Sequence, residues 1–213
     1  MIFNQKIAQQ TAESLLQINA IKLNPKNPFT WASGWQSPIY CDNRVALSYP
    51  DIRTNLCQRV SSEIRSNYDS DIIIAGVATG AIGIGMLVAQ ELGLPFIYVR
   101  PEPKKHGRKN QIEGKLDSGQ KVVVIEDLIS TGKSSLNAVN ALREAKSEVL
   151  GMLALFTYGF PQAALAFEEA DVKLQTLCDY SQLLNVALSQ NKITETESQN
   201  LSEWRKDPAN WTP

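Results

Sequence analysis

The sequence predicts an α/β domain with a central, mostly parallel sheet that is flanked by helices. Continuous apolar runs have the length and composition of strands that are covered on both faces. Segments with helical spacing of apolar residues lie between these runs, so the strands are expected to be joined by crossover helices. A chain of 213 residues can bury such a core within a single domain, residues 1–213.

The N-terminal third predicts two helices separated by an irregular, aromatic segment. The first helix is expected over residues 5–20, where apolar positions recur at helical spacing. Residues 29–44 read FTWASGWQSPIYCDNR and combine aromatic with turn-forming residues, which predicts short strands and loops. The second helix is expected over residues 51–66, because Pro50 is a helix-start signal and apolar residues then recur every four positions.

The rest of the chain predicts the sheet. Strands are expected at residues 72–78, 95–100, 121–127 and 149–158. Residues 79–83 (TGAIG) predict a turn, residues 84–92 and 134–145 predict helices, and Gly93 is expected to cap the first of these. The interval between the second and third strands is about 20 residues long, polar and expected to be irregular, which is typical of functional or disordered loops.

Composition excludes some functional classes. Hydrophobic residues make up 43% of the chain, charged residues 20%, and the net charge is −1. This balance offers no bulk attraction to nucleic acid or to an anionic membrane. The three cysteines are sparse and widely spaced, which predicts neither a disulfide framework nor a zinc site and favours the cytoplasm. Residues 72–90 carry no charge, but their four glycines favour a buried strand, turn and helix over a membrane span.

Residues 122–135, VVVIEDLISTGKSS, carry the clearest chemical signal. A buried strand is expected to end at Glu126 and Asp127, and small residues then lead into a helix. Carboxylates accept hydrogen bonds from sugar hydroxyls, and the free N–H groups of a helix N-terminus bind phosphate. The pattern indicates a sugar-phosphate site, with a solvated acidic turn before a capped helix as the alternative. A nucleotide P-loop is excluded because Asp127 stands where that motif needs glycine.

Three further segments are candidates for ligand contact. Residues 100–114 hold five cations and the sole histidine, and predict either a basic lid over a polyphosphate or a solvated charge run. The glycines of residues 76–85 permit close backbone approach to a ligand. Residues 29–44 are either an aromatic-packed hairpin or the floor of a pocket for a planar ring.

Together these segments resemble the type I phosphoribosyltransferases and, more narrowly, the orotate phosphoribosyltransferases. Residues 122–135 resemble the motif of the superfamily that binds phosphoribosyl pyrophosphate (PRPP). Residues 29–44 resemble the hood of the orotate enzymes, and Arg100 with residues 104–107 resembles their catalytic loop. The resemblance covers roughly residues 10–185 and implies the family fold, with a small N-terminal hood. The hood would comprise mainly residues 1–45 with C-terminal contributions, the core about residues 50–185 and the long flexible catalytic loop about residues 100–115.

The resemblance also implies an activity and the residues that carry it. The reaction is transfer of the phosphoribosyl group from PRPP to orotate, which gives orotidine 5′-monophosphate (OMP) and pyrophosphate in pyrimidine biosynthesis. Catalytic roles fall to Lys104, His106 and Asp127. PRPP would contact Arg100, Lys104, His106, Glu126, Asp127, Leu128, Ile129, Ser130, Thr131, Gly132, Lys133, Ser134, Ala78, Thr79 and Gly80. Orotate would contact Ser130 and the backbone of Tyr40 and Cys41.

The cofactor implied is Mg²⁺, held mainly by PRPP, with Asp127 reaching it through water and no direct protein ligand. The partners implied are the two small substrates and a second copy of the chain, whose loop acts in trans across a homodimer. No nucleic acid or membrane partner is implied.

Four positions depart from the pattern of many relatives, because Ala32, Pro101, Gly80 and Tyr158 stand at or near places where basic residues are common. Arg44, the one arginine of residues 29–44, is therefore our hypothesis for the group that binds the orotate carboxylate. The alternatives are a purine phosphoribosyltransferase on the same core and an RNA-binding regulator with the PRPP fold.

Overall fold

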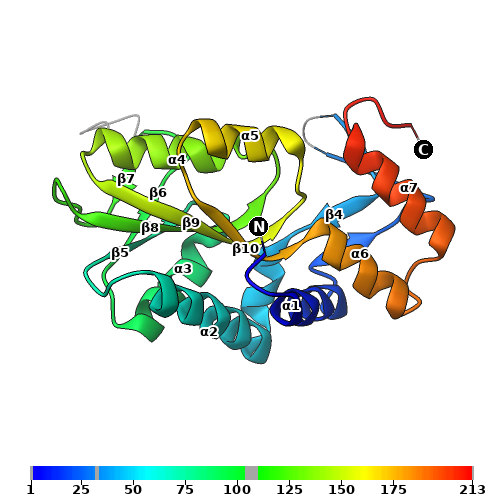
Figure 1. Cartoon of the computed structure of the whole chain (residues 1–213), viewed down its shortest axis with the longest axis horizontal. Coiled ribbons are helices and arrows are strands. Elements are labelled where there is room, and N and C mark those ends of the chain that lie inside the picture. The colour runs from blue at the N-terminus through cyan, green and yellow to red at the C-terminus, as the bar shows by residue number, and fades with distance from the viewer. Residues whose placement is uncertain (1, 32–33, 104–109, 213) are drawn as a thin grey trace.

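A six-stranded sheet forms the centre of the computed structural model, which describes residues 2–31, 34–103 and 110–212 (Figure 1). The strand order is β10-β9-β8-β5-β6-β7. All neighbouring strands are parallel except β6 and β7, which pair in the antiparallel sense. The strands are β5 (Ile73–Val77), β6 (Phe96–Val99), β7 (Ile112–Glu113), β8 (Lys121–Ile129), β9 (Glu148–Thr157) and β10 (Leu174–Asp179). The predicted fold class, a mostly parallel sheet flanked by helices, is confirmed.

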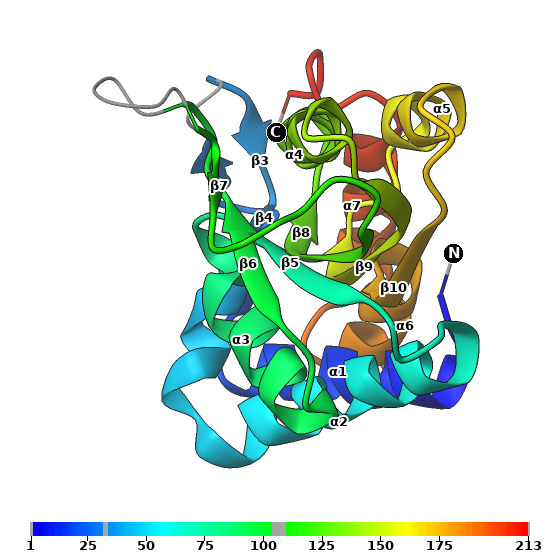
Figure 2. The same ribbon diagram turned by 90° about the vertical axis from the view of Figure 1, so that its left-hand side faces the viewer.

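Helices cover both faces of this sheet (Figures 1 and 2). Helices α4 (Lys133–Glu144) and α5 (Pro161–Glu169) lie over one face, and α1 (Gln5–Gln17), α2 (Pro50–Asn67), α3 (Gly80–Leu92) and α6 (Tyr180–Ser189) lie over the other. Alternate side chains of β8 enter the two cores, with Val122 and Val124 toward α4 and Val123 and Ile125 on the opposite side. Burial on both faces explains why these strands read as continuous apolar runs.

Residues 21–41 form two small antiparallel sheets beside the carboxyl edge of the main sheet. Strand β1 (Ile21–Leu23) pairs with β4 (Ile39–Cys41), and β2 (Phe29–Thr30) pairs with β3 (Gln36–Ser37). The 3₁₀ helix η1 (Asn43–Ser48) then leads into α2. We call residues 21–41 the hood segment.

The C-terminal helix α7 (Glu195–Lys206) packs against the hood segment through Trp204. The indole of Trp204 is fully buried and donates from Nε1 to the carbonyl oxygen of Gln36 at 3.1 Å. Its ring lies 5.5 Å from that of Trp31 and 5.8 Å from that of Tyr158. An aromatic cluster therefore joins the end of the chain to the hood segment and to the end of β9.

Several predicted boundaries were wrong. Strand β8 does not end at Glu126 and Asp127, because Leu128 and Ile129 still pair with Phe156 and Thr157 of β9. The predicted turn at residues 79–83 is shorter, since α3 begins at Gly80. The polar interval after β6 contains the short strand β7. Elements α5, β10, α6 and α7 were not predicted. Within the described residues, no helix is both long and apolar enough to cross a membrane.

We predict that Trp204→Ala lowers the free energy of unfolding by about 3–5 kcal/mol, because it removes a fully buried indole from the aromatic cluster. Trp204→Phe, which keeps a ring but loses the N–H donor to Gln36, should cost less, on the order of 1–3 kcal/mol. Urea unfolding followed by circular dichroism measures both. Equal stability of Trp204→Ala and the natural protein would contradict a structural role for α7.

Candidate active site

Glu126 is a buried carboxyl group near the carboxyl end of β8. Its side chain is only 4% exposed. One oxygen accepts from the backbone N–H of Asp127 at 3.0 Å, and the other accepts from the hydroxyl of Ser135 at 2.7 Å. Ser135 lies in the first turn of α4. Glu126 therefore holds the start of that helix against the strand.

Burial changes the acidity of both carboxyl groups of the pair. Desolvation raises the pKa of Glu126 well above its ordinary value, and the neighbouring carboxylate of Asp127 acts in the same direction. Burial also raises the pKa of Asp127, while hydrogen bonding and the positive charge of Arg44 oppose that shift. Of the two, Asp127 thus has the environment that better supports a negative charge.

The turn from β8 to α4 supplies backbone donors beside these carboxyl groups. Residues 130–132 connect the strand to the helix, and Gly132 adopts a left-handed conformation with φ of 81° at the helix N-cap. A Cβ atom at this position would lie 2.9 Å from the ring of Phe167. Small residues before a helix N-terminus leave N–H groups accessible to an anion, so the turn can hold one phosphate group.

The loop from β5 to α3 lies directly across from Asp127. It contains Ala78 and Thr79, which are joined by a cis peptide bond, and continues into α3 at Gly80. A Cβ atom built on Gly80 would collide with the carboxylate of Asp127. Glycine at this position therefore lets the carboxylate lie against the loop backbone.

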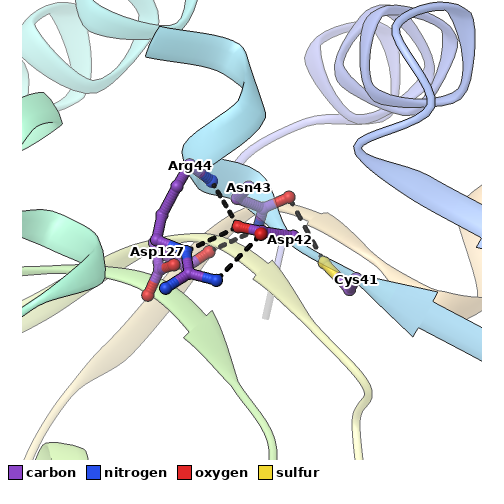
Figure 3. A network of polar contacts seen from close by, with 5 residues as sticks. All are labelled: Cys41, Asp42, Asn43, Arg44 and Asp127. Atoms are coloured by element: carbon purple, nitrogen blue, oxygen red, sulfur yellow. Dashed lines mark hydrogen bonds and ion pairs between the residues drawn. The ribbon is translucent and has the colours of Figure 1, made fainter.

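A polar network joins the start of η1 to the end of β8 (Figure 3). Asn43 is buried and donates from Nδ2 to the carbonyl oxygen of Asp127 at 2.6 Å. The amide oxygen of Asn43 accepts from the thiol of Cys41 at 3.3 Å. Arg44 donates to both carboxylate oxygens of Asp42, from Nε at 2.6 Å and from Nη2 at 2.8 Å. These contacts set the hood segment beside the acidic end of the strand.

Two adjoining pockets open at this edge of the sheet. The polar pocket has a volume of about 430 Å³ and is lined by Cys41, Asp42, Arg44, Val77, Ala78, Thr79, Gly80, Glu126, Asp127, Leu128, Ser130, Thr131, Gly132 and Ser134. The aromatic pocket has a volume of about 620 Å³ and is lined by Thr30, Trp31, Trp35, Tyr40, Cys41, Leu128, Ser130, Thr131 and Tyr158. Cys41, Leu128, Ser130 and Thr131 belong to both linings.

The aromatic pocket has flat apolar walls suited to a planar ring. The indole rings of Trp31 and Trp35 are stacked at 6.3 Å, and the ring of Trp31 lies 5.1 Å from that of Tyr158. Trp31 is fixed by its own hydrogen bond, from Nε1 to the carbonyl oxygen of Ile39 at 3.1 Å. Aromatic walls stabilise a bound ring by stacking and by excluding water.

The structure brings most of the predicted site residues together. The polar pocket is lined by the predicted residues Ala78, Thr79, Gly80, Glu126, Asp127, Leu128, Ser130, Thr131, Gly132 and Ser134. Tyr40 lines the aromatic pocket, and Cys41, Leu128, Ser130 and Thr131 line both.

Of the other predicted residues, some line neither pocket, one lines a different pocket from the one expected, and two lie outside the described residues. Ile129 is fully buried in the core, and Lys133 is exposed outside both linings. Arg100 pairs with Glu113 at 3.4 Å and lines neither pocket. Arg44, expected at the orotate carboxylate, lines the polar pocket and is absent from the lining of the aromatic pocket. Lys104 and His106 lie outside the described residues, as does Ala32.

Sequence reasoning missed Asp42, Asn43 and Tyr158 as site residues. Asp42 and Asn43 directly precede Arg44, and these two polar residues after the aromatic stretch were an available signal. Tyr158 was noted only as a position near which relatives commonly carry a basic residue, and its role as a pocket wall arises because the hood segment packs Trp31 against its ring.

A family profile and individual relatives both show similarity of this chain to one protein family. A phosphoribosyl transferase domain profile matches residues 50–178. An orotate phosphoribosyltransferase of Phocaeicola vulgatus is 58% identical over 200 residues, covering 94% of each chain. Another from Listeria innocua is 50% identical over 205 residues, covering 96% of this chain and 98% of the relative.

Solved structures show the same likeness. An orotate phosphoribosyltransferase from Aeropyrum pernix superposes with a TM-score of 0.72 at 26% identity, covering 86% of this chain and 99% of that one. A Leishmania donovani UMP synthase superposes with a TM-score of 0.77 at 29% identity and covers 93% of this chain. The match spans 42% of that longer protein.

We predict a pH-dependent stability difference between the natural protein and Glu126→Gln. The pKa of Glu126 is raised by folding, so its contribution to stability is present below its ordinary value of 4.5 and is lost as the pH rises through the folded pKa. Raising the pH from about 4 to about 8 should therefore destabilise the ligand-free natural protein relative to Glu126→Gln, by up to about 1.4 kcal/mol per pH unit. Urea unfolding at a series of pH values measures this.

Glu148→Gln is the matched control, because Glu148 is an exposed glutamate at the opposite end of a neighbouring strand. This variant removes one carboxylate outside the buried pair, so it measures the effect of the change in net charge alone on the pH profile. A Glu126→Gln profile parallel to the natural one would show that Glu126 is ionised at the same pH in the folded and unfolded states.

Proposed function

This chain belongs to the phosphoribosyltransferase family, among the orotate phosphoribosyltransferases, and we propose that it transfers the 5-phosphoribosyl group from PRPP to orotate. The products are OMP and pyrophosphate. The observation that carries the proposal is the pair of adjoining pockets: one suits a sugar phosphate, the other suits a planar base, and they share Ser130, Thr131 and Cys41. The bond exchanged at C1′ of the ribose would lie where the two pockets meet.

The polar pocket would hold PRPP. Asp127, and Glu126 beside it, would accept hydrogen bonds from the ribose hydroxyls. The turn of residues 130–134 would bind the 5′-phosphate through its N–H groups and the hydroxyl groups of Ser130, Thr131 and Ser134. Ala78, Thr79 and Gly80 would lie along the diphosphate, because their loop forms the opposite side of the pocket.

The aromatic pocket would hold orotate. Tyr40 and Cys41 would present their backbone to the pyrimidine, and Ser130 lies where base and sugar meet. The rings of Trp31 and Tyr158, whose centroids lie 5.1 Å apart, would form one aromatic wall against which the base packs.

Electrostatics then promotes the reaction. Early cleavage of the bond between C1′ and the diphosphate leaves a ribose with oxocarbenium character and a highly charged leaving group. The carboxylates near the ribose favour its developing positive charge, and cations directed at the diphosphate stabilise the leaving group. The mechanism needs no covalent nucleophile from the protein. Exclusion of water by a closed loop would protect the activated sugar from hydrolysis.

The pocket is compatible with Mg²⁺ that is held mainly by the substrate. Mg²⁺ prefers oxygen ligands and keeps several of its waters, and Asp127 places a carboxylate in the polar pocket. Among residues 2–31, 34–103 and 110–212, no three histidine, cysteine or acidic side chains gather as a metal site. We propose that Asp127 contacts the ion through water, because Mg²⁺ usually keeps several of its own waters. When bound, the ion neutralises and orients the diphosphate.

The proposal includes a homodimer in which Arg100, Lys104 and His106 of one subunit reach the diphosphate in the other. Lys104 and His106 belong to residues 104–109, and the support for this role is the resemblance of the loop sequence to that of the orotate enzymes. Location in the cytoplasm stays a prediction that rests on the sparse cysteines.

A pyrophosphate-release assay with orotate, PRPP and Mg²⁺, each omitted in turn, tests the function. We expect release only when all three are present, and OMP should form in equal amount. Replacing orotate with adenine or hypoxanthine tests the purine alternative, and a filter-binding assay with RNA tests the regulator alternative. Release with a purine but not with orotate would reject the assignment.

A mixing experiment tests the loop in trans. We predict that Lys104→Ala lowers kcat by about 10²–10³-fold without unfolding the protein, because the lysine would stabilise the leaving group. Asp127→Asn should be similarly impaired through loss of the carboxylate at the ribose. If the loop acts across the dimer, subunit exchange between the two inactive variants creates one intact site per heterodimer and restores activity.

Lys146→Ala, in which an exposed lysine outside both pockets is removed, is the control for the loss of a positive charge. Mixed variants that remain inactive after verified subunit exchange would show that the loop acts within its own subunit. An unchanged kcat for Lys104→Ala would show that residues 104–109 take no part in the reaction.

A further inference from the structure

The polar pocket presents an electrostatic problem for the substrate proposed to bind there. Three acidic side chains line it, those of Asp42, Glu126 and Asp127. PRPP carries a phosphate and a diphosphate, so its negative charge must be compensated inside an acidic pocket. Arg44 is the one cationic side chain among the described residues of that lining.

The guanidinium of Arg44 is oriented by Asp42 and keeps donors to spare. Arginine has five N–H groups in a planar fork. Two of them, on Nε and Nη2, donate to the carboxylate of Asp42, which leaves three. The Arg44 side chain is 55% exposed and lines the polar pocket, so it keeps donors for a ligand bound there. A guanidinium held in this way loses little conformational freedom when it binds phosphate oxygens.

The position of Arg44 favours the diphosphate over the base. The side chain shares the polar pocket with the loop of residues 77–80 and is absent from the lining of the aromatic pocket. That loop cannot supply a cation of its own at Gly80, because even a Cβ atom there would collide with the carboxylate of Asp127.

We propose that Arg44 binds the diphosphate of PRPP, with Asp42 as the residue that positions its guanidinium. This inference rests on the proposed function and replaces the initial assignment of Arg44 to the orotate carboxylate. The cation required opposite the loop is supplied from the hood side of the pocket, through a residue at the start of η1.

Calorimetric titration of the protein with PRPP in the presence of Mg²⁺, and separately with OMP, measures binding and does not depend on turnover. OMP carries the ribose, the 5′-phosphate and the base but lacks the diphosphate. Loss of charge-assisted hydrogen bonds should weaken PRPP binding to Arg44→Ala by at least about tenfold, while OMP affinity should stay within about twofold. In steady-state assays, KM for PRPP should rise and KM for orotate should stay nearly constant.

Two further variants make the result specific. Arg44→Ala leaves Asp42 unpaired, so repulsion alone could weaken PRPP binding. The double variant Asp42→Asn with Arg44→Gln keeps the net charge of the pocket and should still lose at least about tenfold in PRPP affinity. Arg65→Ala is the matched control, because Arg65 is 54% exposed, pairs with Glu91 and lines neither pocket.

Unchanged PRPP affinity in the double variant would overturn the proposal. A loss of OMP affinity as large as that of PRPP would assign Arg44 to the base, the ribose or the 5′-phosphate and would also overturn the proposal. Failure of the proposed function would be a separate outcome, in which the natural protein makes no OMP from orotate and PRPP. The PRPP titrations of the natural protein, the two Arg44 variants and Arg65→Ala would still report whether Arg44 binds PRPP.

Discussion

The burial of Glu126 near the end of β8 is the constraint on which the site depends. A buried carboxyl group must have hydrogen-bond partners, and the two it has are the Asp127 N–H and the Ser135 hydroxyl. The first fixes the backbone at the neighbouring acid, and the second fixes the start of α4. Between them β8 ends at Ile129 and residues 130–132 turn the chain into α4, which begins at Lys133. This turn and the first residues of α4 are the proposed phosphate cradle. The position of the cradle thus follows from keeping one polar group satisfied inside the core.

A second contact brings the hood segment to the same place. Asn43 donates to the carbonyl oxygen of Asp127, so the residues that follow β4 are attached to the strand that carries the acids. Asp42 and Arg44 on either side of Asn43 are thereby placed in the polar pocket, and Tyr40 and Cys41 in the aromatic pocket. Trp204 supports the other side of the hood segment through Gln36. One buried amide and one buried indole therefore hold the two pockets side by side.

The sheet and its acidic edge could be predicted because their signals are local. Continuous apolar runs mark strands that are buried on both faces, and small residues behind two acids mark an anion-binding turn. The predictions failed where the sequence pattern of a strand was weak or where the strand depends on pairing with a neighbouring strand. The extension of β8 to Ile129 depends on pairing with Phe156 and Thr157 of β9. The two acidic residues before Leu128 give no sign that the strand continues. Strand β10, LQTLCD, has too little apolar continuity to be recognised without its neighbour β9.

By itself the sequence determined the fold class, the chemistry at the end of β8 and the family resemblance, because each depends on residues close together in the chain. Tertiary structure alone decided which side chains share a pocket. Arg44 and Asp127 are far apart in sequence, and Tyr158 and Trp204 reach the hood segment from the C-terminal third. Whether Arg44 faces the base or the diphosphate depends on two contacts with Asp127, the hydrogen bond from Asn43 and the close approach of Gly80. Both contacts join residues that are far apart in the chain, so local sequence spacing does not reveal them.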